Sequence, residues 1–87
     1  MIKVVKITAL WCSGCIIMNK VWNQIMKNYS IETISYDYDM DEEEVQTYSP
    51  GKVLPVFIFY QDEKEVKRLV GEHSYEEMES IIQELGD

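Results

Sequence analysis

The two cysteines of this chain stand three residues apart, and their setting restricts the fold more than any other feature of the sequence. They follow a run rich in β-branched side chains, residues 2–8, which predicts a strand. From Ser13 onward the apolar residues recur at helical spacing. A bridge between Cys12 and Cys15 would close too short a loop to act as a structural crosslink. The pair is therefore expected to carry chemistry at a strand-to-helix turn.

Changes of hydrophobic period along the chain predict the element order β-α-β-α-β-β-α. The predicted strands are residues 2–8, 31–38, 56–60 and 65–70, and the predicted helices are residues 13–28, 41–48 and 75–85. A βαβ crossover makes the first two strands parallel, whereas the tight turn between the last two makes them antiparallel. We expect an α/β fold in one domain, residues 1–87, with a four-stranded mixed sheet and helices on both faces.

Capping boxes are predicted at the starts of two helices, Asp41 with Glu44 and Ser74 with Glu77. In the first helix, helical spacing places several side chains on the buried stripe: Cys15, Met18, Trp22, Ile25 and Tyr29. The outward face of the same helix is expected to carry Asn19, Lys20, Asn23 and Lys27. Gly86 is placed to end the last helix.

Eight basic residues against sixteen acidic ones give a formal net charge of −8, which argues against nucleic acid or an anionic membrane as a partner. No apolar run approaches the roughly 18–20 residues that cross a bilayer. Lysines interrupt the N-terminal apolar run and no small-residue cleavage site precedes the cysteines, so we expect a cytoplasmic protein. The acidic run 37–44 is interpreted as a solvated helix start, with a cation site or a docking patch for a basic partner as the alternative.

The position of Cys12 at a helix start explains why it would be reactive. Unpaired backbone N–H groups and the positive end of the helix dipole stabilise an anion there. The thiolate is the nucleophile in disulfide exchange, so this setting favours Cys12 as the attacking sulfur. Cys15 begins the apolar stripe and is expected to point inward, where it would resolve a mixed disulfide.

Zinc and iron–sulfur sites also use the Cys-x-x-Cys spacing. Zinc commonly takes four ligands, and beyond its two cysteines this chain adds only the distant His73, so a closed site would need a dimer. We expect His73 to be a loop or capping residue rather than a catalyst. A dimeric metal or cluster protein, and a redox-inactive binding module, remain the alternatives to an oxidoreductase.

Over nearly its whole length the chain resembles the thioredoxin family. The features that match are Trp11-Cys12-Ser13-Gly14-Cys15 after the first strand, Leu54-Pro55 before the apolar strand, the hairpin, and Val70-Gly71 before the last helix. The resemblance implies a protein-disulfide oxidoreductase that needs no cofactor and exchanges electrons with protein disulfides in redox homeostasis. It further implies a monomer that is recycled by a flavin-dependent reductase.

The resemblance also implies roles for residues beside the cysteines. The Leu54–Pro55 bond should be cis and face the cysteine pair, with the Leu54 backbone pairing with the substrate chain. The other residues expected to form the docking surface are Trp11, Ser13, Gly14 and Gly71. For Trp11 the alternative is partial core packing, and for Gly71 it is the mere end of a strand.

Several departures from the family pattern affect the chemistry. Lys6 stands where thioredoxins place a buried acid, so it could stabilise the Cys15 thiolate, pair with an acid such as Asp37, or cover apolar surface with its stem. The chain lacks the first strand and helix of full thioredoxins, which makes it similar in size to glutaredoxins. Its Leu-Pro-Val and Gly-Glu-His-Ser segments differ from a glutathione site, so glutathione dependence is disfavoured.

Overall fold

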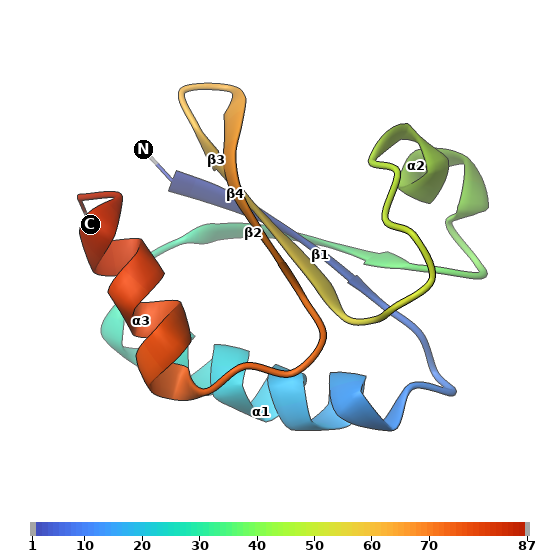
Figure 1. The fold of residues 1–87 in the computed structure, drawn as a ribbon, viewed down its shortest axis with the longest axis horizontal. Helices are drawn as coiled ribbons and strands as arrows, with labels where there is room; N and C mark the ends of the chain where they lie inside the picture. Colours follow the sequence, from blue (N-terminus) through green and yellow to red (C-terminus); the bar gives the residue numbers. More distant parts are fainter. Residues whose placement is uncertain (1, 87) are drawn as a thin grey trace.

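The central strands β1 (Ile2–Thr8) and β3 (Val56–Gln61) are the most apolar of the sheet because both of their faces are covered. A computed structural model describes residues 2–86 and shows four strands in the order β2-β1-β3-β4 (Figure 1). The remaining elements are α1 (Ser13–Asn28), β2 (Glu32–Asp37), α2 (Glu42–Thr47), β4 (Lys64–Val70) and α3 (Tyr75–Glu84). The predicted element order and mixed sheet are confirmed, with ends that differ by a few residues at most.

Strand directions gather four connections at one edge of the sheet. β1 runs parallel to β2 and antiparallel to β3, and β3 runs antiparallel to β4. Ile7 near the end of β1 lies beside Val56 at the start of β3, and Val56 lies beside Val70 at the end of β4. The segments after β1, after β2, before β3 and after β4 therefore all meet at this edge.

The two faces of the sheet carry separate apolar cores, because successive strand residues point to opposite sides. Against one face, α1 and α3 pack on Val4, Phe57 and Phe59. Against the other face, Val45 of α2 packs on a cluster from β1 and β3: Val5, Ile7, Val56 and Ile58. Helices on both faces are thus confirmed, and α1 packs against the sheet face that carries Val4.

One of the two predicted capping boxes is wrong. The Asp41 side chain makes no cap hydrogen bond to α2. Its Oδ2 accepts instead from the backbone N–H of Asp37 at 2.8 Å, because the turn after β2 folds back on itself. Asp37 Oδ1 in turn accepts from the N–H groups of Asp39 and Met40. The second predicted box, Ser74 with Glu77, is confirmed at the start of α3, and Gly86 follows that helix with a positive φ of 91°.

Within residues 2–86, no helix is both long enough and apolar enough to cross a bilayer.

Candidate active site

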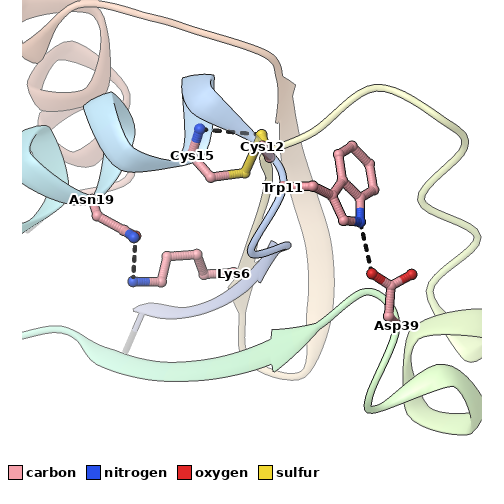
Figure 2. The surroundings of a disulfide bond; sticks show 6 residues. All are labelled: Lys6, Trp11, Cys12, Cys15, Asn19 and Asp39. Atoms are coloured by element: carbon pink, nitrogen blue, oxygen red, sulfur yellow. Dashed lines mark hydrogen bonds between the residues drawn. A yellow bond between two sulfur atoms is a disulfide. The ribbon is translucent and has the colours of Figure 1, made fainter.

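Cys12 occupies the N-cap of α1, where the turn after β1 ends. Its backbone is extended, with φ −96° and ψ 105°, and its N–H donates to the Ala9 carbonyl at 3.2 Å. Its sulfur accepts from the backbone N–H of Cys15 at 3.1 Å (Figure 2). N-cap side chains normally offer an oxygen to this orphan N–H group. Here the sulfur of a cysteine fills that position, so negative charge on Cys12 would be stabilised by the helix start.

Cys12 and Cys15 are joined as a disulfide with their Cα atoms 5.3 Å apart. Cys12 is 9% exposed and Cys15 is 2% exposed, so the expected inward position of Cys15 is confirmed. Ala9 lies with them in a small cluster against which Tyr38 and Leu54 pack. Of the two sulfurs, a partner reaches Cys12 more easily.

Leu54, in the segment before β3, packs against this cluster. The Leu54–Pro55 peptide is cis, as expected. Leu54 packs against the cysteines, and the buried Pro55 accepts through its carbonyl from the Gly71 N–H at 2.8 Å. Gly71 has a φ of +85°, a conformation that favours glycine. Its hydrogen bond to Pro55 joins the end of β4 to the segment that contains the cis peptide.

Trp11 lies on the surface, so the alternative of core packing is wrong. Its side chain is 63% exposed. The indole Nε1 donates to Asp39 Oδ2 at 2.6 Å (Figure 2). The ring also meets that of Tyr38 edge-on, with centroids 6.3 Å apart. These contacts fix a broad apolar side chain next to Cys12. No local pattern in the sequence points to Asp39 as a partner of Trp11, because it lies in a different loop, after β2.

Lys6 lies on the face of β1 that is covered by α1. Its Nζ donates to Asn19 Oδ1 at 3.0 Å, on the turn of α1 that follows Cys15 (Figure 2). Burial of the ammonium lowers the pKa of Lys6 from its ordinary 10.5. The expectation that Asn19 faces outward is therefore wrong, since this half-buried amide meets the lysine. The contact formed is also with an amide rather than with the suggested acid, Asp37.

Ser13 is exposed beside Cys12, whereas Gly14 is partly covered by an acidic side chain. A Cβ atom added to Gly14 would come within 3.2 Å of a Glu72 carboxylate oxygen. Glu72 follows Gly71 in the connection from β4 to α3 and was not among the residues predicted from the sequence. Its place over the cysteine motif depends on the tertiary path of this connection.

His73 acts in the loop and helix cap, as expected. Its ring nitrogens lie 3.0 Å from a Glu77 carboxylate oxygen and 3.1 Å from the Val70 carbonyl oxygen. In the part of the chain that the structure describes, histidine, cysteine and acidic side chains form no group of three or more that could hold a metal ion.

A family model for thioredoxin matches residues 1–84, across the whole arrangement just described. The chain belongs to the thioredoxin family. Among its relatives, the thioredoxin-like protein CXXS1 of Arabidopsis thaliana is 34% identical over 65 residues, which are 74% of this chain and 54% of that protein. The chain thus spans about half the length of this curated relative.

Solved thioredoxins share the fold. The thioredoxin NaTrxh of Nicotiana alata is 28% identical, with a TM-score of 0.88 over 99% of this chain and 74% of its own. A malarial protein matches with a TM-score of 0.90 over 100% of this chain and 99% of its own, at 21% identity, which shows likeness of fold alone. Within this fold, Glu72 lies over Gly14 of the cysteine motif, and Lys6 meets Asn19 on the turn of α1 that follows Cys15.

Proposed function

We propose that this protein is a thiol–disulfide oxidoreductase that exchanges a Cys12/Cys15 dithiol with the disulfides of other proteins. The observation that carries the proposal is the disulfide at the N-terminus of α1 in a thioredoxin-family chain. The unequal exposure of the two sulfurs supports a division of labour, with Cys12 attacking and Cys15 resolving.

The reaction transfers two electrons in two exchange steps. In the reduced protein, the Cys12 thiolate attacks one sulfur of the partner disulfide, forms a mixed disulfide and releases the other partner sulfur as a thiolate, which takes up a proton. Cys15 then loses its proton and attacks the Cys12 sulfur. The Cys12–Cys15 bond forms, the mixed disulfide breaks, and the second partner sulfur leaves and is protonated.

The surface around Cys12 supports docking of an extended partner segment. Exposed apolar side chains lie on neighbouring loops: Leu10, Trp11, Met40 and Val53. We propose that they bind apolar groups of the partner while the backbone of Leu54 pairs with its chain. We propose that Ser13, Gly14 and Gly71 complete this docking surface, since their small side chains leave room for the partner backbone.

Turnover would require an electron donor that reduces the Cys12–Cys15 disulfide again. We propose a flavin-dependent reductase as that donor, and a monomer in the cytoplasm as the working form. The family membership supports the proposal of a donor, because a dithiol oxidised by exchange has to be reduced again before the next turnover.

The reduction of insulin disulfides by dithiothreitol tests this function. We expect the native protein to accelerate the reaction and Cys12→Ser to abolish the acceleration, because the attacking sulfur is lost. Cys15→Ser should accumulate a mixed disulfide that is seen as added mass under non-reducing conditions. Acceleration by Cys12→Ser at the native rate would refute the proposal and favour a redox-inactive binding module.

A further inference from the structure

Glu72 is held above the cysteine motif by anchored neighbours on both sides. Before it, the Gly71 N–H donates to the Pro55 carbonyl at 2.8 Å. After it, the His73 N–H points to Met18 Sδ at 3.2 Å. The connection from β4 to α3 therefore crosses α1 with its backbone fixed (Figure 1). The Glu72 side chain extends from this bridge over Gly14.

The absence of a side chain at Gly14 makes room for this carboxylate. An added Cβ would stand 3.2 Å from Glu72 Oε2 and 3.3 Å from its Cγ, closer than ordinary contact allows. Gly14 lies between the two cysteines and is the second residue of α1. The carboxylate consequently lies at the start of α1, over the residue between the two cysteines, where the helix dipole favours negative charge.

A second carboxylate lies on the other side of the disulfide. Asp39 accepts the Trp11 indole N–H at 2.6 Å and so stays next to the exposed residue that precedes Cys12. Lys6 is half-buried between β1 and α1 and bonds to Asn19. Two carboxylates, Glu72 and Asp39, thus lie on loops beside the cysteine motif, whereas the Lys6 ammonium lies beneath α1.

We propose that Glu72 is a specificity-determining residue that selects disulfides with positive charge beside the reacting sulfur. This inference rests on the proposed function and narrows its substrate class to cationic disulfides. A partner sulfur in contact with Cys12 brings its neighbouring groups within a few ångströms of the Glu72 carboxylate. At such distances in water one charge pair changes a rate by about threefold to fivefold, and more where solvent is excluded. Anionic disulfides such as oxidised glutathione are disfavoured by the same field.

Three small disulfides of different charge test the inference: dicationic cystamine, uncharged hydroxyethyl disulfide and anionic oxidised glutathione. The fully reduced protein is mixed with each at pH 7 and about 20 mM ionic strength, and its oxidation is followed by tryptophan fluorescence and thiol titration. The measured quantity is the ratio of the cystamine rate to the oxidised-glutathione rate, and the rate with the uncharged disulfide reports any change in general thiol reactivity.

We expect the native ratio to favour cystamine and to fall by about threefold in Glu72→Gln, with reversal toward oxidised glutathione in Glu72→Lys. About 0.5 M NaCl should also reduce the native ratio, because a Debye length of roughly 4 Å weakens the attraction even across this short separation. Glu63→Gln is the matched control. It removes the same charge at the β3–β4 turn, which the sheet register places at the opposite end of β1, and should leave the ratio unchanged.

The outcomes separate this inference from the function on which it rests. A native ratio near one, or one that Glu72→Gln and Glu63→Gln change equally, overturns the role of Glu72 while disulfide exchange stands. Failure of the reduced protein to react with all three disulfides overturns the proposed function, and the inference with it. A loss of fold in Glu72→Gln would change all three rates together. In that case the inference is judged by the rate ratio of Glu72→Lys and by the effect of NaCl on the native ratio.

Discussion

At the scale of single residues, Cys12 has a structural role as well as a chemical one. Its sulfur accepts from the Cys15 N–H and so takes the place of an N-cap oxygen. Serine is a strongly preferred N-cap residue, whereas alanine is not. Cys12→Ser therefore removes the nucleophile while keeping an acceptor for the helix start. This makes it a better test of chemistry than Cys12→Ala, which would also weaken α1.

Lys6 is expected to make the cysteine pair more oxidising. Its ammonium lies behind α1, bonded to Asn19 on the turn that follows Cys15, and should stabilise negative charge on the reduced pair. Lys6→Met keeps a long apolar stem but removes the charge. We expect the midpoint potential to become more negative by about 15 mV, or about 0.7 kcal/mol, because the reduced form loses stabilisation. Equilibration with glutathione buffers of known ratio measures it.

Lys3→Met is the matched control for this charge. Lys3 lies on the same strand, with its Nζ 5.7 Å from the centroid of the Tyr60 ring and far from the cysteines along β1. Its replacement should leave the potential within a few millivolts of the native value. Equal shifts in Lys3→Met and Lys6→Met would attribute the effect to net charge and contradict a specific role of Lys6.

At the scale of elements, the start of α3 links stability to pH. The His73 ring, with the Ser74 N–H, holds the pKa of Glu77 below its ordinary 4.5. The unfolded chain therefore binds this proton first as the pH falls. The contribution of Glu77 to stability is complete above about pH 4.5 and is lost as the pH falls through the lower folded-state pKa.

Urea unfolding of the native protein and of Glu77→Gln between pH 6 and pH 3 tests this linkage. We expect the native protein to be the more stable at pH 6 and its advantage to shrink below pH 4.5. Glu76→Gln removes a carboxylate from the same first turn but outside the capping box, and should not reproduce the change. A difference between native protein and Glu77→Gln that stays constant over this range would contradict the linkage.

The two predicted capping boxes show what sequence patterns can and cannot reveal. Ser74 and Glu77 form theirs because the chain enters α3 in an extended conformation. Asp41 has the same spacing to Glu44, but its carboxylate is taken by the Asp37 N–H in the preceding turn. The strands and helices were predictable because each has its own periodicity. The contacts of Asp39 and Glu72 were not, because each depends on two segments distant in the sequence.

At the scale of the whole molecule, sheet topology assembles the site. The cysteine turn follows β1, the Asp39 turn follows β2, Pro55 precedes β3 and Gly71 follows β4, and the strand directions bring these connections to one edge. The placement of Pro55 near the cysteines was expected only from the resemblance to thioredoxins, because the βαβ crossover alone does not say where β3 joins the sheet. The position of Glu72 over Gly14 could not be predicted, because it depends on the path that the connection from β4 to α3 takes across α1.

The net charge of −8 on a molecule measuring 32 × 26 × 17 Å predicts a marked dependence of stability on salt. The acids repel one another more in the compact state than in the unfolded chain. At about 20 mM ionic strength the Debye length is roughly 20 Å, comparable with the molecule, and at about 0.5 M it is roughly 4 Å. We expect this increase in NaCl to raise the free energy of unfolding of the oxidised protein at pH 7, measured in urea, by on the order of 1 kcal/mol.

Near pH 4.5, the isoelectric point, the repulsion largely vanishes, and the same increase should change stability little. Equal salt effects at both pH values would mean that NaCl acts through apolar burial rather than through screening.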